Sequence, residues 1–320
     1  MKELKISARK FAEWSGGGQL RSLILHSDQI LLWGGVNPVN GPRSHFQAVA
    51  VSLDSRTATQ NWNVVVEKSM PFVHAAIHDE SLLLVIPHNF TRSFTGYLEY
   101  DIRTGIQKSQ HKFDEVILSC LSVDKQLYLG TAFNGVYRVF QRKNGVDTEF
   151  AAAIDSRYQL ETIRTVGNNI LVLSEFDRTL SKLVYCHSAF TSDGQSLWKI
   201  ESPYRQFVST ESKLIFWDEE SPALQVYDID SAQNTAVMEL ASPPLESPVV
   251  IGAFGIAYAC SDCSIRIRSW SGGEWVIYKQ LSSGTIALGY DSHRNVLFAA
   301  FSGNFRDTTT NLVMLEIQGI

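Results

Sequence analysis

The stretch that decides the fold runs from Ser122 to Gly145 and reads SVDKQLYLGTAFNGVYRVFQRKNG. A polar turn at 123–125 precedes a short apolar run at 126–130, which suits a buried strand. Residues 136–141 alternate along a second strand, and Asn144-Gly145 follows it. Because a tight hairpin turn needs positive φ, Asn-Gly is a strong hairpin signal. The unit is therefore turn, strand, loop, strand and turn.

The same unit recurs along the whole chain. Apolar runs that follow a polar turn begin at Ile30, Leu82, Leu127, Ile170, Leu214, Ile256 and Val296. The intervals between them are 52, 45, 43, 44, 42 and 40 residues. A propeller blade of four strands needs about 40–50 residues, so this period predicts an all-β fold, a seven-bladed β-propeller of four-stranded antiparallel blades.

The ends of the chain predict how the ring closes. Third strands are expected at 46–53, 97–102, 136–141, 182–188, 223–229, 264–270 and 311–317. The seventh repeat stops after its third strand, whereas an extra strand at 4–8 precedes the first repeat. We expect this N-terminal strand to complete the last blade, because closure removes an open sheet edge. The expected organisation is one domain spanning residues 1–320.

Composition limits the partners and the compartment. The net charge of −5 and the pI near 5.9 argue against general binding to nucleic acids or anionic membranes. The N-terminus has no apolar signal-peptide core, and no apolar run approaches the length of a membrane-spanning helix. Four cysteines are too few for a disulfide scaffold of this size. These features predict a reduced, cytoplasmic protein.

Part of the repeat resembles a known family of propellers. The segment DKQLYLGTAFNGVYRV at 124–139 is similar to the repeat of quinoprotein-type propellers, with Gly-Thr after the second strand and Asn-Gly before the third. The segments at 50–62, 100–105 and 193–200 resemble the part of that family's repeat that runs from Asp to Trp, from the third strand to the fourth. Quinoprotein dehydrogenases usually carry an eighth blade and adjacent cysteines, which this chain lacks. The resemblance therefore implies the scaffold without its quinone, and we expect no cofactor. The Gly-His and Trp-Asp signatures of WD40 repeats are missing apart from Trp217-Asp218.

Few residues suggest chemistry. Cys260 and Cys263 form the only Cys-x-x-Cys motif, but a structural zinc site needs further ligands, so core or turn cysteines are the favoured interpretation over metal binding. His74 and His78 lie four residues apart on a predicted strand, roughly 13 Å from each other, which is too far to share a metal. We find no nucleophile elbow, P-loop or dinucleotide-binding motif.

Loop lengths predict a binding surface. In a propeller, the connections from second to third strands and from fourth to first strands share one face. Long loops usually carry function, and Arg and aromatic residues are typical of interface hot spots. The alternative is tolerated surface insertion. The predicted partner-binding residues on these connections are Arg43, Phe90, Arg92, Phe94, Arg157, Tyr158, Tyr204, Arg205, Phe305 and Arg306. Changes on the opposite face, at Arg142 or Lys143, are expected to leave binding intact.

Two function classes remain open. The first is a protein-interaction module or scaffold, for example an inhibitor or immunity-type protein that masks an enzyme or toxin. Its partner would be another protein, with an acidic surface that complements the local basic and aromatic patch. The second class is a small-molecule enzyme of lactonase or lyase type with its site at the channel mouth, where His74, His78 and Glu99 would be the first residues to test. The sequence favours the first class and predicts no catalytic or metal-binding residue.

Overall fold

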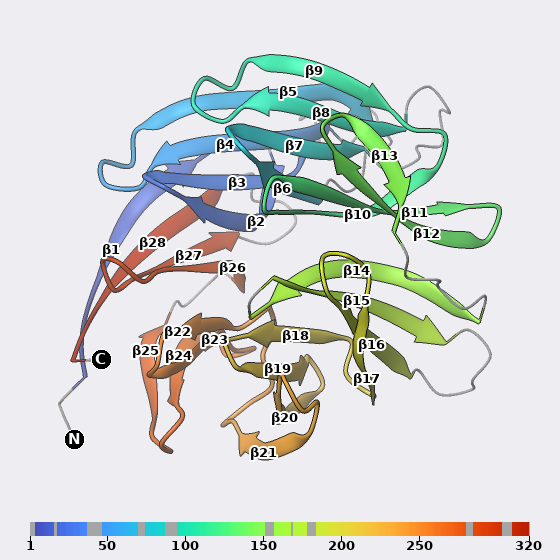
Figure 1. Ribbon diagram of the computed structural model, residues 1–320. Coiled ribbons are helices and arrows are strands. Elements are labelled where there is room, and N and C mark those ends of the chain that lie inside the picture. The colour runs from blue at the N-terminus through green and yellow to red at the C-terminus, as the bar shows by residue number, and fades with distance from the viewer. Residues whose placement is uncertain are drawn as a thin grey trace.

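The computed structural model describes the chain except residues 1–3, 16–17, 37–46, 70–73, 87–94, 151–156, 168, 178–183, 280–283, 303–308 and 320. All secondary structure in the described part is β-strand. The strands form seven four-stranded antiparallel sheets. The sheets follow one another around a ring in sequence order, from blue to red in Figure 1. The protein is therefore a seven-bladed β-propeller, as the repeat predicts.

Each blade runs from an innermost first strand to an outermost fourth strand. Blades 1 to 4 consist of β2 Gly18–His26, β3 Gln29–Val36, β4 Gln47–Asp54 and β5 Gln60–Ser69; β6 His74–His78, β7 Ser81–Ile86, β8 Gly96–Asp101 and β9 Gln107–Lys112; β10 Val116–Val123, β11 Gln126–Phe133, β12 Val136–Lys143 and β13 Val146–Glu149; and β14 Tyr158–Val166, β15 Ile170–Asp177, β16 Tyr185–Phe190 and β17 Ser196–Ser202.

The remaining blades follow the same order until the ring closes. Blades 5 to 7 consist of β18 Gln206–Ser209, β19 Lys213–Asp218, β20 Ser221–Asp228 and β21 Asn234–Glu239; β22 Val249–Ile251, β23 Gly255–Ala259, β24 Ser264–Ser269 and β25 Glu274–Lys279; and β26 Gly284–Asp291, β27 Val296–Ser302, β28 Thr310–Gln318 and β1 Lys5–Trp14.

The core consists of seven apolar clusters, one at each junction between neighbouring blades. Strand β7 illustrates how a strand contributes to two of these clusters. Leu82 and Leu84 pack toward blade 1, whereas Leu83 and Val85 pack toward blade 3. Because successive side chains alternate across a strand, a strand buried on both faces must be apolar throughout. This explains the continuous apolar runs that mark each second strand in the sequence.

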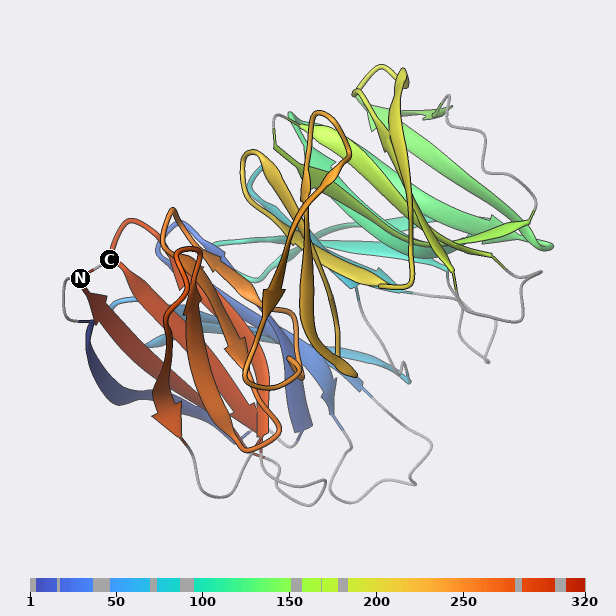
Figure 2. The ribbon, with the colours of Figure 1, turned by 90° about the horizontal axis from the view of Figure 1, so that it is seen from below.

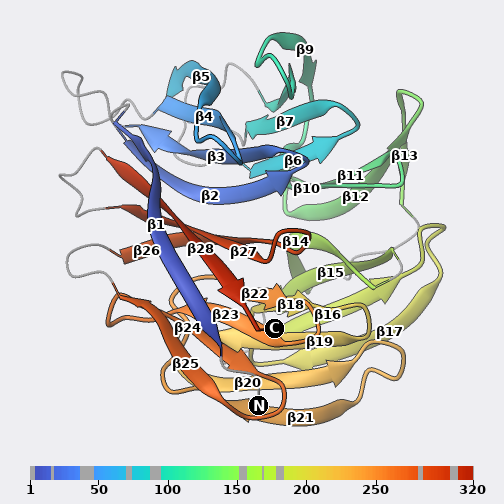
Figure 3. The ribbon, with the colours of Figure 1, turned by 90° about the vertical axis from the view of Figure 1, so that its left-hand side faces the viewer.

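The N-terminal strand closes the ring as predicted, and it is longer than predicted. β1 pairs antiparallel with β28 from Lys5 opposite Gln318 to Trp14 opposite Thr310. The two strands run side by side in Figures 1 and 3, and Figure 2 shows the start of β1 beside the end of β28. The expected strand covered only 4–8. It extends further because Trp14 is buried in the cluster that joins blades 7 and 1.

A tryptophan contact joins blade 1 to blade 2. The indole Nε1 of Trp62 donates to the backbone carbonyl of Ile102 at 2.9 Å. Gly105, in the same turn, has φ +68, and a Cβ at that position would lie 2.7 Å from the Trp62 ring. Asp101 supports the turn, since its carboxylate accepts the backbone N–H of Thr104 at 2.9 Å. The Asp-to-Trp stretches seen in the sequence therefore contribute to packing between blades.

Candidate functional site

The two faces of the ring differ in the length of their loops. We call the face that carries the connections from second to third and from fourth to first strands the connection face, and the other the hairpin face. On the connection face, 10 residues separate β3 from β4 and nine separate β7 from β8, whereas Asn134-Gly135 alone join β11 to β12. The strand bounds thus confirm that the connections of blades 1 and 2 are expanded.

Six of the ten predicted partner-binding residues lie outside the described residues, and their placement stays a prediction. They are Arg43, Phe90, Arg92, Phe94, Phe305 and Arg306. The other four lie in blade 4 or in the connections on either side of it. They are Arg157, Tyr158, Tyr204 and Arg205.

The buried ring of Tyr158 contacts two cationic side chains. Tyr158 begins the innermost strand β14 and is 5% exposed. The Arg157 guanidinium lies 5.5 Å and the Lys199 ammonium 4.7 Å from the centre of its ring. Both distances fall in the range of cation–π contacts. A partner would therefore meet Arg157 and Lys199, with Tyr158 acting through them.

The segment that carries Tyr204 and Arg205 is held from below by the buried His187 and the partly buried Arg164. Nε2 of His187 lies 3.0 Å from the carbonyl oxygen of Tyr204, so this nitrogen carries the proton that it donates. Nδ1 of the same ring lies 2.9 Å from the hydroxyl of Ser174, which donates to it. Arg164 donates to the carbonyl of Phe207 and stacks on its ring at 5.2 Å. These contacts fix the backbone on both sides of Arg205.

Arg205 projects from this anchored segment into an ion pair. Its Nε lies 2.9 Å from the carboxylate of Glu161, and the side chains of Arg205 and Glu161 are 58% and 18% exposed. Glu161 occupies a register shift in the pairing of β14 with β15. An extra residue in a strand redirects its side chain, which explains how an inner strand presents this carboxylate to the connection face.

Burial controls the protonation of the groups beneath the segment. It lowers the pKa of His187 to about 4, so the ring is neutral near pH 7. Burial also lowers the pKa of Arg164, and the like charge of Arg205 adds to this effect. Nearby, burial raises the pKa of the Tyr185 hydroxyl, to which Glu161 contributes. His187 therefore adds no charge to this region near pH 7.

Blade 3 carries an exposed apolar tip that is not among the predicted partner-binding residues. Phe133 and Val136 face each other across the Asn134-Gly135 turn, and each is 51% exposed. Both turn residues have positive φ, as a tight hairpin requires. Its signal in the sequence is two large apolar residues that flank Asn-Gly, in a connection too short to be predicted as a binding loop from its length.

A buried carboxylate lies behind this tip. Glu115, in the connection between β9 and β10, is 9% exposed and accepts a hydrogen bond from the hydroxyl of Thr131. It also pairs with Arg138 at 3.1 Å. Arg138 is 41% exposed at its side chain, so this face of blade 3 presents a positioned cation beside its apolar tip.

The residues considered for an enzyme do not converge. His74 and His78 lie on the innermost strand β6, and Nδ1 of His78 lies 2.8 Å from the hydroxyl of Ser122. Glu99 lies on the third strand β8, where its carboxylate accepts hydrogen bonds from the hydroxyls of Ser81 and Ser109. Glu99 is thus part of a different cluster from the two histidines.

The cysteine motif forms a turn. Cys260 is 2% exposed, and its carbonyl accepts the backbone N–H of Cys263, which has φ 61. Across the residues that the structure describes, no group of three or more His, Cys, Asp or Glu side chains is arranged to hold a metal ion. Within the same residues, no helix is long and apolar enough to cross a membrane.

Arg142, on the hairpin face, also takes part in packing between blades. Its guanidinium pairs with Asp147, donates to the hydroxyl of Tyr97 and lies 5.7 Å from the Phe113 ring. It therefore bridges blades 2 and 3, and replacing it will disturb packing as well as the surface. Lys143 is the better neutral position on this face.

Comparisons with known proteins place the chain by fold. No family model matches the sequence, and no curated protein is a significant match. BamB from Moraxella catarrhalis is similar with a TM-score of 0.56 at 13% identity, covering 96% of this chain and 99% of that one. The WD40 β-propeller domain of Doa1 is similar with a TM-score of 0.59 at 12% identity, covering 97% of each chain. The chain is a β-propeller, and at such low identity the similarity shows the fold alone. Since one match is a WD40 propeller, the quinoprotein-type resemblance receives only loose support.

Proposed function

We propose that this propeller is a protein-interaction scaffold that binds its partner through the connection face. The observation that carries the proposal is the exposed pair Phe133 and Val136 beside the ion-paired Arg138. An exposed phenylalanine next to a positioned arginine matches the composition of interfaces, which are enriched in aromatic residues and arginine. Arg157 and Arg205 extend the same kind of surface over blades 4 and 5.

The partner in this proposal has an acidic surface. Arg157 and Arg205 lie on the connection face of a protein whose net charge is −5, and Lys199 of the outermost strand β17 reaches the same Tyr158 ring as Arg157. A local cluster of cations on an acidic chain favours a complementary partner and disfavours others. A specific form of the proposal is an inhibitor or immunity-type protein that masks an enzyme or toxin, acting in the cytoplasm without a cofactor.

Affinity purification with matched surface variants tests the proposal. Phe133→Asp places a charge on the connection face, and Val276→Asp places the same charge on an outer strand at a residue of nearly equal exposure, 54% against 51%. We expect the native chain and Val276→Asp to retain one protein at a fixed molar ratio and Phe133→Asp to lose it. Retention by all three proteins, or no partner for any of them, would contradict the proposal.

A further inference from the structure

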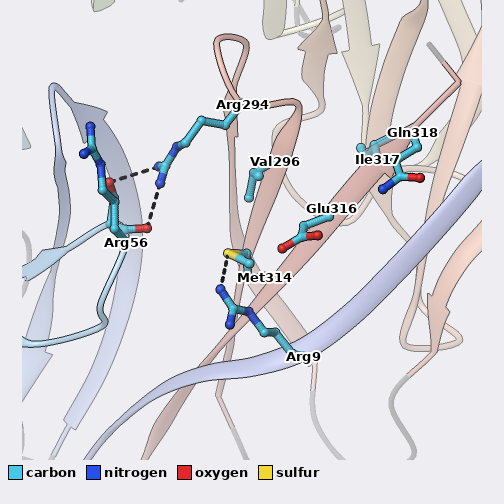
Figure 4. A pocket seen from close by; sticks show the side chains of 9 residues that line it. Arg9, Arg56, Arg294, Val296, Met314, Glu316, Ile317 and Gln318 are labelled. Atoms are coloured by element: carbon cyan, nitrogen blue, oxygen red, sulfur yellow. Dashed lines mark hydrogen bonds between the residues drawn. The ribbon is translucent and has the colours of Figure 1, made fainter.

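A cavity of about 340 Å³ opens at the junction between the last and first blades, on the hairpin side of the ring (Figure 4). Its floor is apolar, since Val296 and Met314 are buried there. Its wall is polar and comes from Arg9 on β1, Glu316 on β28 and the turns that carry Arg294 and Ser55. The volume lies within the range of small-molecule sites.

Two opposite charges face this cavity without pairing with each other. Arg9 is paired with Met314 and Ser7 with Glu316 in the β1–β28 register, so Arg9 and Glu316 lie on the same face of the sheet as diagonal neighbours. Among the described residues, the Arg9 guanidinium contacts only the Met314 sulfur, at 3.7 Å, and has no carboxylate within salt-bridge distance. Glu316 receives one long hydrogen bond, from Ser7 at 3.4 Å.

Arg294 adds fixed donors on the other side. Its Nε donates to Asp291 at 2.5 Å, and Nη1 and Nη2 donate to the carbonyl and hydroxyl of Ser55 at 3.0 Å each. A guanidinium has five N–H groups, so these three contacts leave two for a ligand. Figure 4 shows Arg294 and Arg9 on different sides of Val296 and Met314, with Glu316 beside them.

We propose that this cavity binds a small zwitterion, namely a free α-amino acid with a compact apolar side chain. The ligand's carboxylate meets Arg9 and the remaining N–H groups of Arg294, and its ammonium meets Glu316. Its side chain covers Val296 and Met314. A simple anion would leave Glu316 without a partner and a simple cation would leave Arg9 without one, so a ligand with both charges fits best.

Calorimetric titration with L-valine, L-leucine and L-methionine tests this site, with acetate and methylamine as ligands that carry one charge each. Binding of at least one amino acid, stronger than either single-charge ligand, is expected. Arg9→Gln and Glu316→Gln should each weaken it by about tenfold or more, because each removes a charge-assisted hydrogen bond. Arg103→Gln is the matched control, since Arg103 is an exposed arginine that pairs with Glu80 in another blade.

No binding of any of the three amino acids at millimolar concentration would overturn the proposal, and so would unchanged affinity in Arg9→Gln. Acetate bound as tightly as the amino acids would overturn its zwitterion selectivity. Melting temperatures of the variants near that of the native protein would show that the loss arises at the site, while a variant that unfolds is replaced by Arg9→Lys, for which a smaller loss is expected. Phe133→Asp should bind the amino acid normally, so this site stands or falls independently of the connection face.

Discussion

Arg294 reaches from the last blade to the first and donates to both the carbonyl and the hydroxyl of Ser55, at 3.0 Å each. The two residues are 239 positions apart in the sequence. Ser55 is 1% exposed, so its carbonyl and hydroxyl oxygens depend on this contact instead of water. The ring is therefore closed twice at the same junction, by the β1–β28 pairing and by this guanidinium.

Arg294→Gln should lower the free energy of unfolding by about 1–3 kcal/mol, because it leaves buried acceptors of Ser55 without their donors. Arg103→Gln should change it little, since Arg103 and its partner Glu80 are 76% and 64% exposed at their side chains. Denaturant unfolding of both variants is the measurement. An equal, small effect at the two positions would show that Arg294 does not hold the junction.

Removal of residues 1–10 should destabilise the whole ring, because blade 7 would lose most of its outermost strand. A chain lacking only residues 1–3, which precede β1, should keep its melting temperature. Calorimetric melting distinguishes the two truncations. If the longer truncation melted like the full chain, closure by the N-terminal strand would not contribute to stability.

Gly105→Ala should be more destabilising than Gly145→Ala. Both glycines have positive φ, +68 and +79, so alanine meets similar backbone strain at each. Only at Gly105 would the new Cβ collide with Trp62, whereas nothing lies within 4 Å at Gly145. The difference between the two losses in unfolding free energy therefore isolates the Trp62 contact, and equal losses would contradict the interblade packing described above.

The buried His187 predicts a pH dependence of stability. Its pKa is about 4 in the folded protein, against 6.5 for the free side chain, so between these values the unfolded chain binds a proton that the folded chain does not. Stability should therefore fall as the pH drops from 6.5 to 4, by about 3 kcal/mol at most.

The variant His187→Gln separates this effect from the rest of the protein. It should be less stable than the native protein near pH 7, and the difference should shrink toward pH 4. Urea unfolding at several pH values measures it. Parallel losses in both proteins across this window would assign the pH dependence to other groups.

The sequence predicted the fold far better than the site. Second strands were readable because residues such as Leu82 to Val85 are buried on both faces and must be apolar throughout. The exposed tip at Phe133 had only a short signal in the sequence, two large apolar residues that flank Asn-Gly, because its exposure depends on how blade 3 sits in the ring. The position of Arg9 beside Glu316 could not be predicted from the sequence either, because it depends on the register of two strands from opposite ends of the chain.

Arg92 and Phe94 extend the binding prediction to a long connection of the same face. If either is a hot spot, its replacement by alanine should cost about 1–3 kcal/mol of binding free energy and leave folding nearly unchanged. Lys143→Ala on the hairpin face should be silent. Loss of binding in Lys143→Ala together with full binding in Phe94→Ala would show that the partner binds the hairpin face instead of the connection face.

The affinity of the purified partner for Phe133→Asp and for Val276→Asp tests the connection face most directly. The two changes add the same charge at large apolar residues that are 51% and 54% exposed, so they differ mainly in their position on the ring. We predict that Phe133→Asp weakens binding by about tenfold or more, mainly through faster dissociation, and that Val276→Asp binds like the native protein. Equal affinity of the two variants, or a greater loss in Val276→Asp, would contradict binding through the connection face.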